Sequence, residues 1–203
     1  MFNIFTNAVK IAHRFVAPLL GEGAVAVDAT VGNGHDTLFL ARNVGFSGKV
    51  YGFDIQAEAL AKTEERLHEA GLSQPVTLVN AGHERMADYV TGSVDVIMFN
   101  LGYLPGSDHR TVTKASTTTS AIAAGLELLR PGGLMSIVVY TGHPGAAEEH
   151  SAVELTVSRV DRRKYCVMRM EFVNRLKKPP YLILIEKNDA FAERGKNNEE
   201  PKA

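Results

Sequence analysis

Two short stretches of this chain combine residue types that could carry out chemistry. The stretch NLGYLPGSDHR (100–110) follows an apolar run and contains an amide, an aromatic ring, a histidine and an arginine. The stretch VDATVGNGHD (27–36) ends a second apolar run with an acid and continues into two closely spaced glycines. Loops of this composition at the ends of strands often bind substrates or cofactors.

The glycine stretch predicts a turn that binds a nucleoside. Gly32 and Gly34 allow backbone conformations that other residues avoid, and they let the main chain approach a ligand closely. Asp54 ends the next apolar run, where a carboxylate can accept hydrogen bonds from both ribose hydroxyls. A glycine pair alone could serve only packing, but together with the strand-end acid it favours a cofactor site.

The residues around the glycines favour one class of cofactor. A dinucleotide site needs a third glycine and a helix N-terminus that can hold a pyrophosphate. Here Thr37 occupies the position of the third glycine, and Asp36 would place a negative charge beside the pyrophosphate. An acid is compatible with the sulfonium or the α-amino group of S-adenosylmethionine. A nicotinamide-dependent oxidoreductase on the same sheet is the alternative from another enzyme class.

The apolar pattern predicts strands that alternate with helices, hence an α/β fold with a mainly parallel sheet. Ligands of such sheets bind outside the carboxyl ends of the strands. Helices are expected at 3–19, 36–44, 57–71, 113–129 and 145–159, and a turn at 130–133. Seven strands are expected at 24–30, 48–55, 76–81, 94–100, 134–140 and, as a closing antiparallel hairpin, 165–173 and 181–187.

Composition limits the class of protein. The 203 residues include 22 Lys and Arg, 23 Asp and Glu and a single cysteine, Cys166. One domain (1–188) and a disordered polar tail (189–203) are expected. The near-neutral charge neither favours nor excludes a nucleic-acid partner. One cysteine and no long apolar run predict a cytoplasmic protein without a membrane anchor.

Several motifs resemble those of known methyltransferases. VDATVGNGHDT, GFDIQ and LLRPGG are similar to motifs of the Rossmann-like class I S-adenosylmethionine-dependent methyltransferases, with Thr30 in place of the usual first glycine. NAVKIAH, DATVGNGHDTLFLA, FNLGYLPGSDH and KPPYLILIEK resemble one bacterial family in particular. That family was described as rRNA methylases and later associated with methylation of 5-aminomethyl-2-thiouridine in tRNA. The likeness extends to Asn188.

The resemblance implies roles within the cofactor site. Asp28 and the backbone from Gly32 to Gly34 would hold the methionine end of the cofactor, Asp54 its ribose, and Gln56 would flank the adenine. The N-terminal helix (3–19) would cover the pocket. Further cofactor contacts are expected from Asn33, His35, Asp36, Thr37, Gly82, His83 and Asn100, of which Gly82 and His83 stand where adenine is usually held.

The stretch from Asn100 to Tyr103 resembles the N/D-P-P-Y/F motif of amino-methyltransferases, with Leu101 and Gly102 in place of the prolines. The Asn100 side-chain oxygen and the Leu101 main-chain oxygen could accept the hydrogens of a target amine. Tyr103 would stack on the target base, and Pro105 would stiffen the loop. The alternatives are an Asn100 that only closes a turn and a Tyr103 that only packs in the core.

An alkylamine is mostly protonated near neutral pH, so a base must take its proton. His109 is the expected base, with Asp108 and His143 as other candidates. The alternatives for His109 are a contact with phosphate and the capping of a turn. Phosphate contacts are expected from Arg110 and Lys114, beside a base turned out of its stack. Two further basic groups could be RNA contacts or ordinary solvated surface: Arg159, Arg162, Arg163 and Lys164; and Arg175, Lys177 and Lys178.

The expected activity is therefore methyl transfer from S-adenosylmethionine to 5-aminomethyl-2-thiouridine at the wobble position of tRNA, without a metal. The expected partner is the tRNA anticodon stem-loop, and a homodimer is left open. An rRNA or small-molecule amine methyltransferase is the alternative within the same class. A non-catalytic RNA-binding module with a vestigial pocket is a further alternative, which the cofactor residues and Asn100 disfavour.

Overall fold

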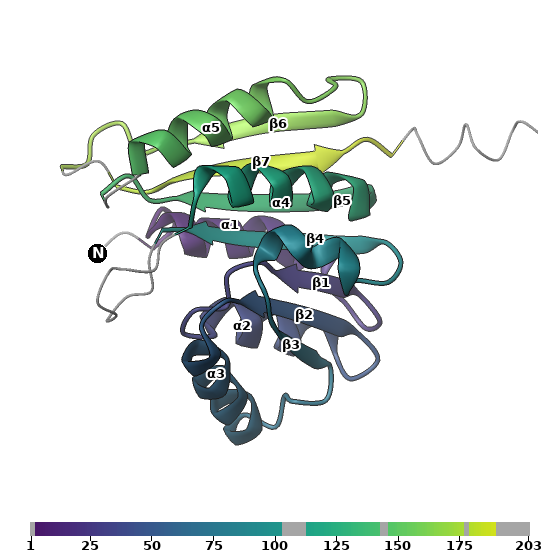
Figure 1. The fold of residues 1–203 in the computed structure, drawn as a ribbon. Helices are drawn as coiled ribbons and strands as arrows, with labels where there is room; N and C mark the ends of the chain where they lie inside the picture. The colour runs from purple at the N-terminus through teal and green to yellow at the C-terminus, as the bar shows by residue number, and fades with distance from the viewer. Residues whose placement is uncertain (1–2, 103–112, 143–145, 177–178, 190–203) are drawn as a thin grey trace, which may run out of the picture.

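A computed structural model describes residues 3–102, 113–142, 146–176 and 179–189. It contains a seven-stranded sheet in the order β3-β2-β1-β4-β5-β7-β6, flanked by helices (Figure 1). The strands are β1 (Val25–Asp28), β2 (Lys49–Asp54), β3 (Val76–Asn80), β4 (Val94–Leu101), β5 (Leu129–Val139), β6 (Tyr165–Met170) and β7 (Tyr181–Lys187). The helices are α1 (Ala8–Val16), α2 (His35–Val44), α3 (Ala57–Glu69), α4 (Ala115–Leu128) and α5 (Ala146–Ser158), with 3-10 turns η1 (Ala17–Leu19) and η2 (His83–Asp88).

The sheet confirms the predicted architecture. β1 to β5 pair in parallel, whereas β7 runs antiparallel to both β5 and β6. The order reverses beside β1: the chain runs outward from β1 through β2 to β3, and then returns to the other side of β1 to form β4. Crevices at such reversal points are the usual ligand sites of open α/β sheets.

Two expectations about local structure were wrong. The N-terminal helix begins at Ala8, where the Asn7 side chain accepts a hydrogen bond from the Lys10 amide, and not at residue 3. The stretch 130–133 does not separate a helix from a strand, because it lies within β5. Gly132 has a φ of 71°, and the register between β4 and β5 shifts at this point. The turn-forming residues therefore make a local irregularity within the strand and do not end it.

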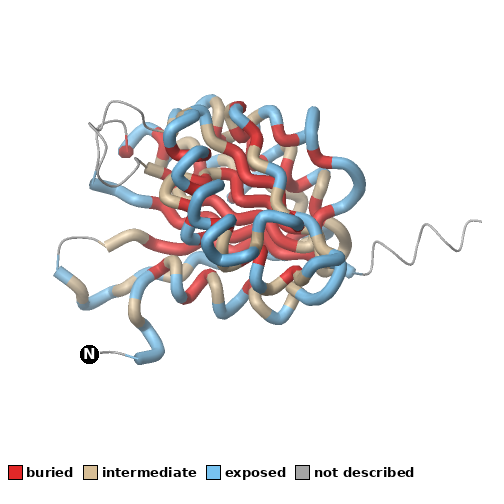
Figure 2. The backbone as a smooth tube through the Cα atoms, turned by 90° about the horizontal axis from the view of Figure 1, so that it is seen from below, coloured by how far each residue is buried: buried red, intermediate tan, exposed pale blue. Residues whose placement is uncertain are grey.

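The sheet separates two apolar cores. Alternate strand residues face opposite ways, so Val27, Ile97 and Phe99 pack under α4, α5 and η2, while Ala26 and Val96 pack under α1, α2 and α3. Figure 1 shows α4 and α5 on the face toward the viewer with α1 and α2 behind the sheet, and Figure 2 shows the buried strands between the two layers. This alternation also decides which layer each strand-end side chain meets.

Candidate active site

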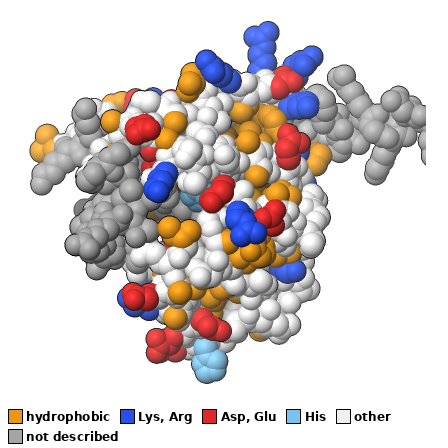
Figure 3. All heavy atoms as spheres, in the orientation of Figure 1, with side chains coloured by type: hydrophobic (Ala, Val, Ile, Leu, Met, Phe, Trp, Pro, Cys, Tyr) orange, Lys and Arg blue, Asp and Glu red, His pale blue; other side chains and the backbone are white. Residues whose placement is uncertain are grey.

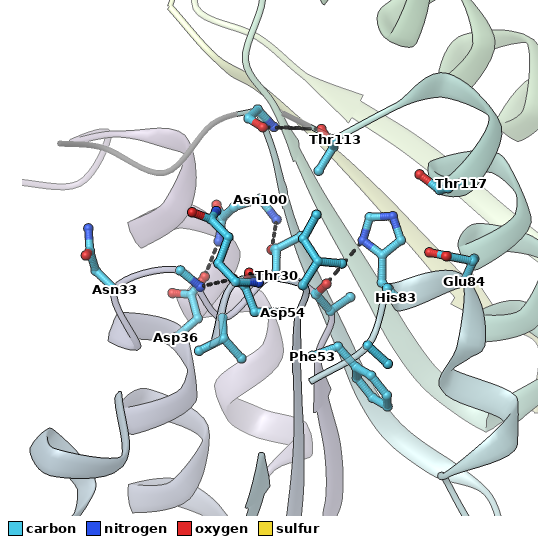
Figure 4. Close-up of a pocket in the computed structure, with 18 of the residues that line it drawn as sticks. Thr30, Asn33, Asp36, Phe53, Asp54, His83, Glu84, Asn100, Thr113 and Thr117 are labelled. Carbon is cyan, nitrogen blue, oxygen red and sulfur yellow. Dashed lines mark hydrogen bonds between the residues drawn. The ribbon is translucent and has the colours of Figure 1, made fainter. Parts of the chain in front are cut away.

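A cavity of about 440 Å³ opens at the carboxyl ends of β1, β2 and β4 (Figure 4). Cavities of this size commonly hold small-molecule cofactors. The structure brings ten of the predicted site residues together on its wall: Gly32, Asn33, His35, Asp36, Asp54, Gln56, Gly82, His83, Asn100 and Lys114. The lining also includes residues that the sequence analysis did not assign, among them Val9, Thr30, Ile55, Glu84, Thr113, Thr117 and Tyr140.

The turn between β1 and α2 requires its glycines. Gly32 and Gly34 have φ angles of 52° and 76°, in the left-handed region that other residues rarely adopt. A Cβ atom on Gly34 would lie 2.5 Å from the Oγ1 atom of Thr63 on α3. Gly32 and Asn33 therefore form the cavity wall, whereas Gly34 is buried and lets α2 and α3 approach each other.

Asp54 is fixed at the end of β2 with its carboxylate on the cavity wall. Its Oδ2 atom accepts a hydrogen bond from the Gly32 amide at 2.8 Å, and its Oδ1 atom accepts one from the Gln56 amide at 2.9 Å. Each carboxylate oxygen can accept a further bond. These remaining positions suit the two hydroxyls of a ribose, so the geometry of Asp54 fits the nucleoside part of S-adenosylmethionine.

Apolar groups line the cavity beyond Asp54. Ile55 follows the strand-end acid and is 59% exposed, and Phe53 and Ala81 lie nearby on the wall. His83 is buried, its Nδ1 atom contacts the Ala29 carbonyl oxygen at 3.2 Å, and burial lowers its pKa, so this ring is neutral at pH 7. A neutral, apolar surface of this kind suits a flat adenine. Ile55 could have been noticed in the sequence as an apolar residue directly after Asp54.

Asp28 and Thr37 lie behind the cavity wall, not on it. Asp28 is fully buried, and it accepts hydrogen bonds from the Thr37 hydroxyl at 2.6 Å and from the Thr30 amide at 3.1 Å. It faces the α2 side because it shares the parity of Ala26 on β1. The structure thus gives both residues a role in holding the glycine turn, in place of the direct cofactor contact that the resemblance implied.

The buried Asp28 makes the stability of the protein depend on pH. Burial, and then the nearby charge of Asp36, raise its pKa from 3.8 to about 7. Between these two values the folded state binds more protons than the unfolded state, so the free energy of unfolding falls as the pH rises. We expect Asp28→Asn to raise the melting temperature relative to wild type more at pH 8 than at pH 5. Differential scanning calorimetry at both pH values measures this.

The exposed Asp88, which pairs with Arg85 at the surface, gives the matched control variant Asp88→Asn. Its melting temperature should differ from that of wild type by a similar amount at both pH values. An Asp28→Asn difference that is the same at pH 5 and pH 8 would mean that Asp28 is already ionised in the folded protein at pH 5.

Asn100 is held at the cavity by the β1 turn and by α2. Its main-chain amide donates to the Thr30 hydroxyl at 2.7 Å, so the threonine that replaces the usual glycine connects β1 to β4. Its side-chain nitrogen donates to the Oδ2 atom of Asp36. The Asn100 Oδ1 atom is buried and has no hydrogen-bond partner among the described residues. Figure 4 shows Asp36 and Asn100 on one side of the cavity, across from His83 and Glu84.

Leu101 does not reach the cavity. Its side chain is fully buried in the core on the α4 side, and its main-chain oxygen accepts a hydrogen bond from the Tyr140 amide at 3.2 Å. The expectation that this oxygen accepts a hydrogen of the target amine therefore finds no support in the geometry. Asn100 itself lines the cavity at this strand end, and its buried Oδ1 atom is an acceptor without a partner among the described residues.

Gly102 and Thr113, the described residues on either side of positions 103–112, contact each other. The Thr113 amide donates to the Gly102 carbonyl at 3.0 Å, and the Gly102 amide bonds to the Thr113 hydroxyl at 3.0 Å. The buried carboxylate of Glu149 accepts the hydroxyls of Thr113 and Thr118 at 2.7 and 2.6 Å. The predicted site residues Tyr103, Pro105, His109 and Arg110, and the other base candidates Asp108 and His143, lie outside the described residues.

The basic groups lie at opposite ends of the strands, some at the cavity end and others at the far end. Lys114 lines the cavity, and Arg175 bonds to the carbonyl oxygens of Phe5 and Thr6 at 2.5 and 2.8 Å. The loop 159–164 precedes β6, whose first residue, Tyr165, pairs with Lys187 of β7. The neighbouring Glu186 of β7 pairs with Leu134, in the first half of β5, so this loop lies at the end of the sheet away from the cavity. Figure 3 shows Lys and Arg side chains gathered over the loop between α5 and β6. Lys177 and Lys178 lie outside the described residues.

Known proteins resemble this chain over most of its length. A sequence model of the family described as "Putative rRNA methylase" matches residues 50–186. An Arabidopsis thaliana protein named as a chloroplastic tRNA (mnm(5)s(2)U34)-methyltransferase is 35% identical over 193 residues, which cover 90% of this chain and 70% of that protein.

Two crystal structures share both sequence and fold with the chain. An rRNA methylase homologue from Clostridium thermocellum is 42% identical with a TM-score of 0.88, and a methyltransferase homologue from Streptococcus mutans in complex with SAH is 37% identical with a TM-score of 0.82. Each match covers 90% of this chain and 98% of the other. The chain therefore belongs to this rRNA methylase family, and it is an S-adenosylmethionine-dependent methyltransferase with the class I fold.

Proposed function

We propose that this enzyme methylates the primary amine of 5-aminomethyl-2-thiouridine at the wobble position of tRNA, which gives the 5-methylaminomethyl nucleoside. The observation that carries the proposal is the buried Oδ1 atom of Asn100, which has no partner in the described part of the chain, on a residue that lines the same cavity as Asp54 and Gly32. An orphaned acceptor at this position calls for a donor from the substrate, and an amine supplies N–H groups. The reaction named for the Arabidopsis relative supports this choice of amine.

Different residues of the chain bind the cofactor, orient the amine and accept its proton. When bound, S-adenosylmethionine supplies an electrophilic methyl group on a sulfonium. Asp54 and the Gly32 turn hold the nucleoside part, and Asn100 accepts an N–H of the amine, which turns the nitrogen lone pair toward the methyl group. The amine must arrive neutral or lose a proton, and His109 remains our proposed base. No protein nucleophile is needed because the sulfonium carries its own leaving group.

The proposed partner is the anticodon stem-loop, whose unstacked bases can enter a cavity without opening a duplex. Lys114 on the wall is placed to attract phosphate. No described helix is long and apolar enough to span a bilayer. We also propose that residues 1–188 act as one domain in the cytoplasm.

Methyl transfer to defined RNAs tests the proposed substrate. We expect the purified enzyme with S-adenosylmethionine to convert the aminomethyl nucleoside of tRNA taken from cells that stop at that stage. Mass spectrometry of digested nucleosides detects the added methyl group. The same tRNA lacking the aminomethyl group, and rRNA, should remain unmodified. Methylation of rRNA or of a free alkylamine in place of the tRNA would establish the alternative reading.

A further inference from the structure

An amide side chain can present either its oxygen or its NH2 group to a substrate, and only the oxygen accepts an amine hydrogen. Asn100 shares the strand parity of Val96 and Met98, so its side chain lies on the α1 and α2 side of the sheet. There its nitrogen meets Asp36, which leaves its oxygen without a described partner. Which end of the Asn100 amide faces Asp36, its oxygen or its NH2 group, therefore depends on whether Asp36 needs a hydrogen-bond donor or an acceptor.

Asp36 requires a donor from each neighbour. Its side chain is only 5% exposed, and the Nε2 atom of His13 lies 2.6 Å from its Oδ1 atom. An ionised carboxylate only accepts hydrogen bonds, so a proton on His13 Nε2 and the NH2 group of Asn100 must face it. A reversed amide would bring the Asn100 oxygen against the carboxylate and leave its NH2 group pointing at the substrate.

His13 is itself held in a fixed orientation. Its ring stacks on Phe39 of α2, with a centroid distance of 3.8 Å and an interplanar angle of 5°. α1 is anchored on the sheet by the buried side chains of Ala8, Ile11, Ala12 and Val16. The N-terminal helix thus supplies the first donor of a chain of hydrogen bonds that runs from His13 through Asp36 to Asn100 and ends at the cavity.

We infer that His13 and Asp36 are positioning residues that fix the polarity of the Asn100 amide, so that the site selects a substrate with an N–H donor. The inference rests on the proposed function, because it assigns the Asn100 oxygen to the amine. It gives α1 a part in the chemistry beyond covering the cavity. His13 and Asp36 act through Asn100 and need not touch the substrate.

Two variants of His13 separate its hydrogen bond from its packing. His13→Phe keeps the stacking on Phe39 but removes the donor, and we expect the single-turnover methyl-transfer rate to fall by about 10²-fold, the usual effect of a displaced catalytic group. His13→Gln retains an N–H donor and should recover most of that rate. The dissociation constant for S-adenosylmethionine should stay within about threefold in both variants, because their cofactor contacts are unchanged. His68→Phe, on the exposed side of α3, is the matched control.

A second readout does not depend on turnover. In protein labelled with ¹⁵N-asparagine, the side-chain NH2 signals of Asn100 are identified by their loss in Asn100→Ala. We expect one of these proton resonances to lie downfield in wild type because of the bond to the carboxylate, and to move upfield in Asp36→Asn and His13→Phe. Signals unchanged in both variants would overturn the inference.

The kinetic outcomes also separate this inference from the proposed function. Wild type that fails to methylate the aminomethyl tRNA refutes the proposed function, and the NMR experiment then still reports on the amide. Active wild type with an equally active His13→Phe variant refutes only the role of His13. An Asp36→Asn variant that binds S-adenosylmethionine about 10²-fold more weakly at an unchanged rate would show that Asp36 acts on the cofactor and not on Asn100.

Discussion

Replacing Asn100 with alanine is expected to lower the rate of methyl transfer by about 10²- to 10³-fold, the usual cost of removing one preorganised hydrogen-bonding group from an active site. In the proposed reaction the Asn100 Oδ1 atom accepts a hydrogen bond from the substrate amine, and the main-chain bond from Asn100 to Thr30 survives the substitution. Cofactor affinity should change by less than about threefold, because Asp54 and the Gly32 turn are untouched. Single-turnover kinetics and isothermal titration measure the two quantities separately.

The exposed Asn174 provides the control Asn174→Ala, which should transfer methyl groups at the wild-type rate. If Asn100→Ala were fully active, Asn100 would have no part in aligning the amine, and another polar group would have to supply the acceptor. If the variant instead lost cofactor affinity at an unchanged rate, Asn100 would belong to the cofactor site alone.

Replacing Asp54 with alanine is expected to weaken S-adenosylmethionine binding by about 10²-fold or more. A hydrogen bond to a charged group contributes roughly 1.5–3 kcal/mol, and each 1.4 kcal/mol is a factor of ten in affinity. The variant loses the carboxylate proposed to accept the ribose hydroxyls and also releases the Gly32 and Gln56 amides that Asp54 holds in place. Isothermal titration with S-adenosylmethionine and with its demethylated product should show the same loss, since both contain the ribose.

Titration with NAD completes this experiment, because wild type is expected to bind the sulfonium cofactor and not the dinucleotide. Asp88→Asn again serves as the surface control, and circular dichroism confirms that the Asp54 variant is folded. Unchanged affinity for S-adenosylmethionine in a folded Asp54→Ala protein would place the ribose elsewhere in the cavity.

The parts of the fold that follow from local sequence patterns could be predicted. Strand and helix periodicity gave the order of the elements, and the parallel sheet then brought Gly32, Asp54, His83 and Asn100 to one edge. Residue types at strand ends were informative because the carboxyl ends of parallel strands converge there. The predicted boundaries failed where local turn chemistry competed with pairing, as at residues 130–133 inside β5.

The remaining features depend on side-chain direction and on contacts between distant segments. Asp28 and Asp54 both end strands, yet Asp28 is sealed behind the turn by Thr37 while Asp54 faces the cavity. The contact between His13 and Asp36 joins α1 to α2, and no periodicity within either helix indicates it. Such contacts follow from how the helices pack on the sheet, which a single sequence does not reveal.

The pairing of Gly102 with Thr113 has a consequence for how the substrate specificity of such an enzyme could change. Gly102 and Thr113 are hydrogen-bonded to each other, and Glu149 accepts the Thr113 hydroxyl, so contacts among described residues hold these two chain positions together. Doubling the length of a flexible loop costs only about 0.6 kcal/mol once its ends are fixed. Loops of other lengths could therefore be inserted between Gly102 and Thr113 in evolution or design. The cofactor-binding part of the site would stay unchanged.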